Sequence, residues 1–387
     1  MKAEIVIAGG GIMGASVAFW LSHFGARDVV MVERDPIFEF SASSRSASGM
    51  RQQFSSELNI KLSQLSIEII RNFEAITGTC TPIRFTQSGY LICAPKGSAA
   101  AAQRLVALQN ACGARTVWLT PSQIAEQFPG VRVDDLDGAS WGAADEGWFD
   151  GVAVMTGFRE AAKRNGVRWI TGEVAGITRR GDRIERVTLA DGSTLSCTAL
   201  INATGAAAGA FASRAGLSLP VYPRKREVIV FESPARVPKD LPLITDASGM
   251  YVRPEGDCFF CGMPPRDDPR ADPTDFNPDP TLFEEHLWPA LAHRIPGFEE
   301  LRVRNRWVGH YEFNEYDQNA LIGPHPECAS FFCINGFSGH GLQQAAAAGR
   351  GLAELIVFGA YRSVDLAPFS PARVFETHQS APELRVI

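Results

Sequence analysis

The sequence lacks the features that mark membrane-spanning, secreted and nucleic-acid-binding chains. No apolar run approaches the ~18 residues of a membrane span, and the formal net charge of −6 at pH 7 argues against nucleic acid as a partner. The eight cysteines are scattered, without the dense spacing of a disulfide framework, so we expect free thiols. The first predicted strand begins near Glu4, which leaves no room for a signal peptide, and we expect a cytoplasmic protein.

Metal-binding spacing is also scarce. Cys258 and Cys261 have the C-x-x-C form of a metal or redox site, but they lie on a predicted strand of a hairpin that turns at residues 254–257. Residues i and i+3 of a strand point to opposite faces, so the two sulfurs would not converge on one ion. With no second Cys or His pair nearby, we predict no metal site.

The first positive signal is a glycine-rich turn close to the N-terminus. The apolar run 5–8 precedes GGGIMG (residues 9–14), and a helix-like segment follows. A second apolar run ends in Glu33, nineteen residues after Gly14, where a dinucleotide-binding unit places a carboxylate for the adenosine ribose. The order of strand, glycine turn, helix, strand and acid predicts that the chain binds a dinucleotide.

Each glycine of this turn has a physical reason. Gly9 permits the tight turn, Gly11 removes a side chain that would block the pyrophosphate, and Gly14 lets the helix pack closely on the strand. The helix N-terminus then presents unpaired N–H groups and its positive dipole end to the phosphates. The predicted contacts of this half are Gly9, Gly11, Ile12, Met13, Gly14, Glu33 and Arg34.

A second strand, glycine turn and helix lies near the C-terminal end. The strand-like run 331–335 leads through GFSGHG (residues 336–341) into a helix-like segment that reaches residue 358. Its N-terminus suits a flavin pyrimidine, where negative charge develops on reduction; a capped surface helix is the alternative. Two such turns meet at one site only if the nucleotide-binding domain is discontinuous.

These motifs together resemble the D-amino acid oxidase superfamily of FAD-dependent oxidoreductases. The resemblance rests on GGGIMGAS with Glu33, SSRSASGMRQ (43–52), INATGA (201–206) and INGFSGHGLQQA (334–345), and it covers nearly the whole chain. The superfamily includes sarcosine oxidases, glycine oxidase, D-amino acid dehydrogenases and subunits of opine and proline dehydrogenases. The C-terminal part is most similar to a mitochondrial branch that takes part in assembling a respiratory complex.

The resemblance implies an α/β fold with two domains, as the 387-residue length also suggests. We expect a discontinuous Rossmann-type FAD-binding domain over residues 1–78, 145–220 and 315–387. An inserted, largely antiparallel β-sheet substrate domain is expected over residues 79–144 and 221–314.

The resemblance also implies the remaining cofactor contacts. Relatives with covalent flavin use a cysteine near Gly309 or a histidine near Ser46, and neither is present, so we expect non-covalent FAD; a histidyl link to His310 is the alternative. For Arg45 the alternative is a solvated charge. The implied contacts are Ser43, Ser44, Arg45, Ser46, Val174, Ala203, Gly205, Gly309, Gly339, His340, Gly341, Leu342 and Gln343.

The implied catalytic residues are Arg51, Tyr251, His310 and Gln343. Arg51 matches the arginine that binds the substrate carboxylate in sarcosine oxidases, although a structural salt bridge is the alternative. Gln343 replaces a second, lysine ligand of that carboxylate, and Tyr251 matches an active-site tyrosine or else packs across the strand. Lys225 and Arg226 are candidate replacement charges, or belong to a solvated face.

The implied function is oxidation of the C–N bond of an amino acid or secondary amine by hydride transfer to the flavin. Sarcosine oxidases carry an oxygen-activating lysine in the strand matching residues 259–261, and none is present here. We therefore expect electrons to pass to a quinone or a protein rather than to O₂. The alternatives are a partner-binding assembly factor, one subunit of a heteromeric dehydrogenase, and a 2-hydroxy acid dehydrogenase. A homo- or hetero-oligomer is expected as a possible assembly.

Overall fold

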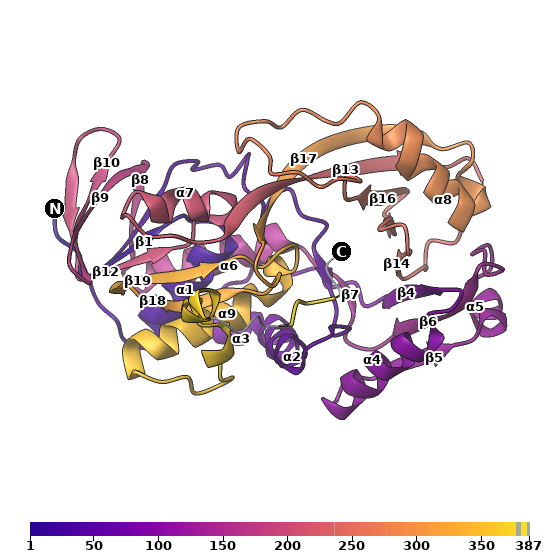
Figure 1. The fold of residues 1–387 in the computed structure, drawn as a ribbon, viewed down its shortest axis with the longest axis horizontal. Helices are drawn as coiled ribbons and strands as arrows, with labels where there is room; N and C mark the ends of the chain where they lie inside the picture. Colours follow the sequence, from indigo (N-terminus) through magenta and orange to yellow (C-terminus); the bar gives the residue numbers. More distant parts are fainter. Residues whose placement is uncertain (236, 377–380, 385–387) are drawn as a thin grey trace.

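The structure is a computed structural model that describes residues 1–235, 237–376 and 381–384. Two sheets dominate it, one in each half of the molecule (Figure 1). The first half contains a six-stranded sheet in the order β18-β19-β12-β1-β2-β8, parallel except for the pair β18–β19. Its strands are β1 (Ile5–Ala8), β2 (Val29–Glu33), β8 (Arg168–Thr171), β12 (Ala199–Asn202), β18 (Leu321–His325) and β19 (Cys328–Asn335).

Helices and a small meander cover the two faces of this sheet, which explains why every residue of β1 is buried. Helix α1 packs against both α6 and α9, and α9 packs against α2. The close approach of α1 and α9 depends on Gly349, where a Cβ would lie 2.3 Å from Ser16 Oγ. The helices are α1 (Ile12–His23), α2 (Glu57–Arg71), α3 (Phe73–Thr77), α6 (Gly151–Arg164), α7 (Ala208–Ser213) and α9 (Gly341–Phe358); the meander is β9 (Val174–Arg180), β10 (Arg183–Leu189) and β11 (Thr194–Ser196).

The second half contains an eight-stranded sheet in the order β17-β13-β16-β15-β14-β4-β6-β5, antiparallel except for β14–β4. Its strands are β4 (Tyr90–Pro95), β5 (Thr116–Leu119), β6 (Leu136–Gly142), β13 (Val221–Glu232), β14 (Leu243–Thr245), β15 (Tyr251–Glu255), β16 (Cys258–Met263) and β17 (Arg302–Asn314). Helices α4 (Ala99–Ala111), α5 (Pro121–Gln127) and α8 (Trp288–Arg294) belong to this half, and the short strands β3 (Gly49–Met50) and β7 (Gly147–Trp148) form a separate pair.

The long strands β13 and β17 connect the two halves (Figure 1). They pair from Val221 with Asn314 to Glu232 with Arg302. Val221 belongs to the core of the six-stranded half, whereas Phe231 belongs to the core of the eight-stranded half. The expected α/β architecture with an inserted antiparallel sheet is confirmed. The domain bounds stay a prediction.

Several local expectations need correction. The pattern of residues 57–77 predicts one helix, but the helix is divided at Asn72 into α2 and α3. The apolar run 85–93 predicts a strand from Phe85, but β4 begins only at Tyr90, because Gly89 has φ +86° and the residues before it contribute a single bridge from Thr86 to Trp148. Strands β5, β6, β14 and β18 were not predicted.

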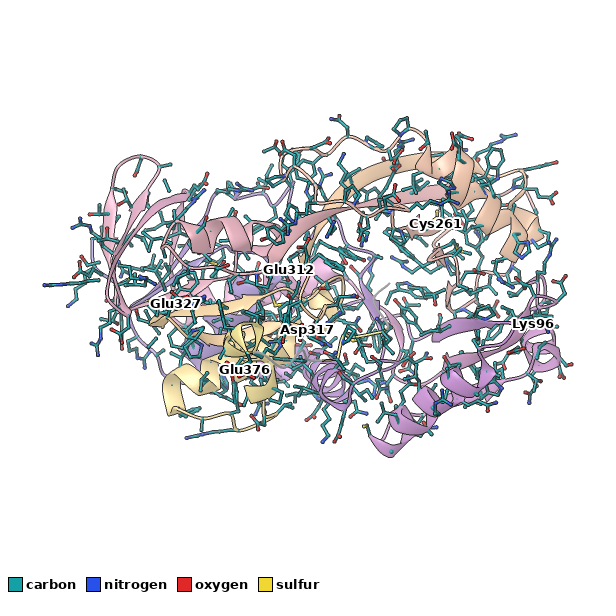
Figure 2. The ribbon with its side chains drawn as sticks, in the orientation of Figure 1. Lys96, Cys261, Glu312, Asp317, Glu327 and Glu376 are labelled. Carbon is teal, nitrogen blue, oxygen red and sulfur yellow. The ribbon has the colours of Figure 1, made fainter. Side chains whose placement is uncertain are left out.

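Cys258 and Cys261 lie on strand β16. Cys258 is partly exposed at the start of the strand, whereas Cys261 is buried in the core of the eight-stranded half (Figure 2). Within the described residues, no group of three or more His, Cys, Asp or Glu side chains is placed to hold a metal ion. No helix in this part of the chain has the length and apolar character needed to cross a membrane.

Candidate active site

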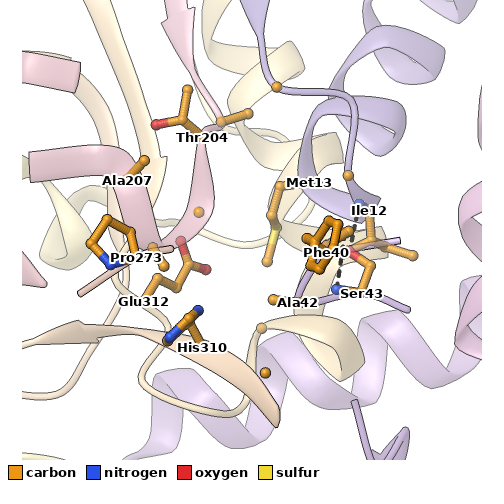
Figure 3. Close-up of a pocket in the computed structure, with 18 of the residues that line it drawn as sticks. Ile12, Met13, Phe40, Ala42, Ser43, Thr204, Ala207, Pro273, His310 and Glu312 are labelled. Atoms are coloured by element: carbon orange, nitrogen blue, oxygen red, sulfur yellow. Dashed lines mark hydrogen bonds between the residues drawn. The ribbon is translucent and has the colours of Figure 1, made fainter. Parts of the chain in front are cut away.

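A cavity of about 270 Å³ opens at the carboxyl ends of β1, β2 and β12. In an open α/β sheet this is the edge at which ligands bind. Figure 3 shows Ile12, Met13 and Ser43 on one side of the cavity, and Thr204, Glu312 and His310 on the other. The predicted residues that line it are Gly9, Gly11, Ile12, Met13, Glu33, Arg34, Ser43, Arg45, Ser46, Val174, Ala203, Gly205, Tyr251, Gly309, His310, Gly339, Gly341 and Leu342.

The N-terminal turn is built as the sequence predicted. Gly9 has φ +98°, and a Cβ there would lie 2.3 Å from Ala203 O. A Cβ on Gly14 would lie 1.9 Å from Gly9 O, so Gly14 serves helix packing and does not itself line the cavity. The N-cap of α1, Gly11, has no side-chain cap, and Ser43 Oγ accepts the N–H of Ile12 at 3.0 Å. The first turn of α1 therefore faces the cavity with little to obstruct an anion.

Glu33 is held by the backbone at the end of β2. Its carboxylate accepts hydrogen bonds from the N–H groups of Gly10 at 2.5 Å and Asp35 at 2.7 Å. The residue is 9% exposed and lines the cavity. A carboxylate can accept about four hydrogen bonds, so acceptor sites are left for ribose hydroxyls.

The C-terminal turn reaches the same cavity. Gly339 has φ +102°, and a Cβ there would lie 2.4 Å from the Tyr311 ring. Helix α9 begins at Gly341 without a side-chain cap, and a Cβ on Gly341 would lie 3.1 Å from Met13 Cε in α1. The two helix starts predicted from opposite ends of the sequence therefore meet in space.

His340 departs from its expected position. Its side chain is 2% exposed and does not line the cavity, and neither ring nitrogen has a hydrogen-bond partner among the described residues. The imidazole lies edge-on to Phe54 at 5.4 Å between ring centroids. Burial lowers the pKa of His340 to about 3, so the ring is neutral. Any contact of His340 with a cofactor would come from its backbone. Ser44 likewise does not line the cavity.

A smaller cavity of about 40 Å³ adjoins the first, with which it shares Ser46, Ala47, Tyr251, Tyr311, Gly339 and Leu342. Arg51 and Gln343 line only this smaller cavity, together with Tyr90. Burial raises the pKa values of Tyr90, Tyr251 and Tyr311, so their hydroxyls stay protonated. Tyr90 and Tyr311 were not predicted; Tyr311 follows His310 directly, but period-2 alternation alone does not show which strand residue faces a ligand.

Arg51 is 2% exposed at the wall of this smaller cavity. Its Nη1 donates to Gln53 O at 2.7 Å, and its guanidinium lies 4.0 Å from the centre of the Phe54 ring. The backbone N–H of Arg51 donates to Gln343 Oε1 at 2.9 Å. Burial lowers the pKa of Arg51, and the charges of Glu383 and Glu146 oppose that shift. A fixed, desolvated guanidinium of this kind can bind a carboxylate.

The candidate charges on β13 are engaged by the loop 267–280. Lys225 Nζ binds the Asp275 carboxylate and Asn277 O, and Arg226 forms a two-point contact with Asp268 at 2.6 and 2.9 Å. Arg226 lines the larger cavity, whereas Lys225 does not. These ion pairs hold the loop beside the cavity. Lys225 and Arg226 therefore bind carboxylates of the loop.

Arg45 and His310 belong to the same wall. Arg45 Nη1 donates to Val308 O at 2.8 Å, and its guanidinium lies between Phe40 and Phe276 at 4.9 and 5.0 Å from the ring centres. Arg45 is therefore a fixed part of the cavity and not a freely solvated charge. Burial lowers the pKa of His310, and its ring packs edge-on against Phe276.

Glu312 is a further cavity residue that the sequence did not indicate. It points into the larger cavity (Figure 3). Burial raises its pKa to about 8, and its Oε2 has no hydrogen-bond partner within the described part of the chain. A buried carboxyl oxygen without a partner is expected where a ligand supplies the missing hydrogen bond.

The family model described as FAD dependent oxidoreductase (DAO) matches residues 4–355. The chain belongs to this FAD-dependent oxidoreductase family. FAD-dependent oxidoreductase domain-containing protein 1 of Xenopus laevis is 38% identical over 408 residues, which cover 95% of this chain and 82% of that protein. Mitochondrial sarcosine dehydrogenase of Mus musculus is 26% identical and covers 92% of this chain, with 40% of its own length matched.

Solved structures of this family confirm the fold. L-proline dehydrogenase from P. horikoshii superposes with a TM-score of 0.84 at 27% identity, covering 96% of this chain and 97% of that chain. Glycine oxidase from Geobacillus kaustophilus has a TM-score of 0.81 at 23% identity, covering 98% and 100%. The cofactor of this chain is FAD. The cavity suits it, because the first turns of two helices and the Glu33 carboxylate line one continuous space.

Proposed function

We propose that this chain oxidises the C–N bond of a small amino acid or N-methyl amino acid, and that the electrons leave to a quinone or a protein acceptor. The single observation that carries the proposal is the lining of the smaller cavity. One buried guanidinium, of Arg51, and three protonated tyrosines line it, and it adjoins the larger cavity where α9 begins. The tyrosines are Tyr90, Tyr251 and Tyr311. Relatives named sarcosine dehydrogenase, dimethylglycine dehydrogenase and L-proline dehydrogenase support the substrate class.

The residues of the smaller cavity have distinct roles in this proposal. Arg51 binds the substrate carboxylate. Gln343 supplies no second cation; its side chain accepts a hydrogen bond from the Arg51 backbone and so fixes that backbone. Tyr251 and Tyr311 orient the substrate through their hydroxyls, and Leu342 helps exclude water. FAD, when bound, supplies the hydride acceptor. No buried base is required, because the neutral amine already has the lone pair that assists hydride departure.

The acceptor follows from the charges around the site. Within the described residues, the lining of neither cavity includes a lysine, and Cys261 is buried on the strand that carries the oxygen-activating lysine in sarcosine oxidases. Arg45 and Arg226 line the larger cavity but bond to Val308 O and Asp268. Without a lysine on that strand, reduction of O₂ loses electrostatic stabilisation. We therefore propose a dehydrogenase with FAD bound non-covalently.

An anaerobic reduction screen tests this function. The FAD-loaded protein is mixed with sarcosine, dimethylglycine, L-proline, glycine, D-alanine and L-lactate, and loss of absorbance near ~450 nm is followed. Bleaching by an amino acid supports the proposal, and Arg51→Gln is expected to slow it. Bleaching by lactate alone identifies a 2-hydroxy acid dehydrogenase. No bleaching by any of the six contradicts the proposal and favours a partner-binding flavoprotein.

A further inference from the structure

The segment that carries Arg51, residues 51–55, is irregular and lies between β3 and Ser56, the N-cap of α2. The segment belongs to no helix or strand, so no regular backbone hydrogen bonds hold it, yet its first four residues are buried. Each of the five bonds to a distant part of the chain. The contacts are Arg51 N to Gln343 Oε1 at 2.9 Å, Gln52 N to Glu146 Oε1 at 2.7 Å, Gln53 Nε2 to Glu146 Oε2 at 2.8 Å, Gln109 Nε2 to Phe54 O at 3.2 Å, and Ser55 N to Glu383 Oε1 at 2.8 Å.

Glu383 reaches this segment from the C-terminal end of the described chain. Its Oε1 accepts from both Ser55 N and Ser55 Oγ, the latter at 2.6 Å, and its Oε2 accepts from Asn59 Nδ2 at 2.8 Å. The residue is 1% exposed. Its backbone is fixed in turn, because Glu383 N donates to Asp317 O at 3.1 Å and Leu384 N donates to Ser55 Oγ at 2.9 Å.

Burying a carboxylate this deeply costs free energy of desolvation, which the hydrogen bonds to the carboxylate must offset. Burial alone would raise the pKa of Glu383, but the hydrogen bonds from Ser55 and Asn59 outweigh burial and lower the pKa. Glu383 therefore stays charged beside Arg51. It lies beyond residue 355, where the match to the family model ends.

We propose that Glu383 is a positioning residue for Arg51. The guanidinium rests on Phe54 and bonds to Gln53 O, so its place at the smaller cavity is set by the segment and not by its own rotamer alone. Glu146 fixes the middle of that segment and Glu383 fixes its end at Ser55. The tail carboxylate thus sets how well the substrate carboxylate is bound, an inference that rests on the role of Arg51 given under the proposed function.

The test uses methoxyacetate, a non-oxidisable carboxylate with the shape of sarcosine, and its neutral amide, methoxyacetamide. Their dissociation constants are measured on the FAD-loaded protein from perturbation of the flavin absorbance. Glu383→Gln keeps the size of the side chain but offers one acceptor oxygen in place of two, so Ser55 or Asn59 loses its bond. We expect Kd for methoxyacetate to rise about tenfold, and Kd for methoxyacetamide and for FAD to change less than about twofold. Glu376→Gln, at an exposed carboxylate of the same tail, is the control.

Two further variants separate the possible failures. Ser55→Ala removes the Oγ donor to Glu383 and the acceptor of Leu384 N, but keeps the bonds from Ser55 N and Asn59 to Glu383. It therefore gives a smaller rise in the methoxyacetate Kd even if Glu383→Gln does not fold. If Ser55→Ala and Glu383→Gln lower Tm but leave the methoxyacetate Kd at its wild-type value, Glu383 is only a structural residue and the proposal is overturned. If Arg51→Gln also leaves that Kd unchanged, the carboxylate site itself is wrong, and the proposed function fails with it.

Discussion

Gly341 at the start of α9 approaches Met13 in the first turn of α1 so closely that a Cβ on Gly341 would lie 3.1 Å from Met13 Cε. The first turns of two helices from opposite ends of the chain thereby face one cavity. Both turns offer N–H groups and positive dipole ends, which stabilise negative charge on phosphates and on a reduced flavin.

Replacing Gly11 with alanine is expected to weaken FAD binding without unfolding the protein. A Cβ there has Ser43 Oγ at 3.3 Å as its nearest neighbour, so the fold can accept it, but the methyl group occupies the approach of the pyrophosphate. We expect the FAD dissociation constant to rise about tenfold or more, which corresponds to ~1.4 kcal/mol. Gly176→Ala in β9, with its nearest contact at 3.5 Å and outside both cavities, is the matched control. Equal FAD affinity in the two variants would refute the role of Gly11.

Replacing Gly14 with alanine is expected to cost stability. A Cβ there would lie 1.9 Å from Gly9 O, a backbone atom that cannot move without shifting β1 against α1. Overpacking of this kind typically costs about 1–3 kcal/mol. Denaturant unfolding of the FAD-free protein measures the loss, so cofactor affinity does not enter. Wild-type stability of Gly14→Ala would show that the helix and strand are less closely packed than described.

His340 is expected to make the protein less stable as the pH falls. Burial holds its folded pKa at about 3, below the ordinary value of 6.5. Between about pH 3 and pH 6.5 the unfolded chain binds a proton at this histidine that the folded protein does not bind. The free energy of unfolding therefore falls as the pH falls through this range. Urea unfolding of wild type and His340→Asn is compared between pH 4 and pH 7. The variant's free energy of unfolding should fall less steeply, by up to ~1.4 kcal/mol per pH unit. Parallel curves would mean that His340 titrates normally.

FAD is expected to leave the protein on acid denaturation. His310 lines the cavity as a neutral imidazole packed against Phe276, and the cysteine used by covalently flavinylated relatives is absent at this position. After precipitation with trichloroacetic acid, the yellow colour should appear in the supernatant. A yellow pellet that persists after washing would instead indicate a histidyl link, and His310→Ala would then have to abolish it.

Loosening the loop 267–280 is expected to speed FAD release. Phe276 packs on Phe40 and His310 and covers one side of the Arg45 guanidinium. Phe276→Ala removes these contacts but leaves the ion pairs of Lys225 and Arg226 intact. We expect the FAD dissociation rate, followed by the recovery of flavin fluorescence, to rise severalfold with little change in Tm. An unchanged rate would mean that FAD does not leave past this loop.

The sequence predicted the parts of the site that depend on local patterns. Backbone conformation or close packing requires glycine at Gly9, Gly14 and Gly339. The spacing of these glycines from the neighbouring strands and from Glu33 can be read directly from the sequence. Strands β1, β2, β12 and β19 of the six-stranded sheet coincide with apolar runs of the sequence, whereas β18 was not predicted. The location in the cell stays a prediction.

The parts that were missed depend on contacts between distant segments. Tyr90 comes from a strand whose start was placed five residues too early, and Glu146 and Glu383 act through hydrogen bonds to residues 52–55 that no local pattern encodes. His340 was expected at the cofactor because it lies within the glycine turn. The backbone there turns its side chain toward Phe54 instead. A buried polar network is decided by tertiary packing, and its members look like ordinary surface residues in a sequence.

The most direct test is a crystal structure of the FAD-loaded protein soaked with methoxyacetate. The account predicts the FAD pyrophosphate at the first turn of α1, the isoalloxazine ring at the start of α9, and the methoxyacetate carboxylate on Arg51 in the smaller cavity. A flavin ring turned away from Gly341, or methoxyacetate bound anywhere other than at Arg51, would contradict it.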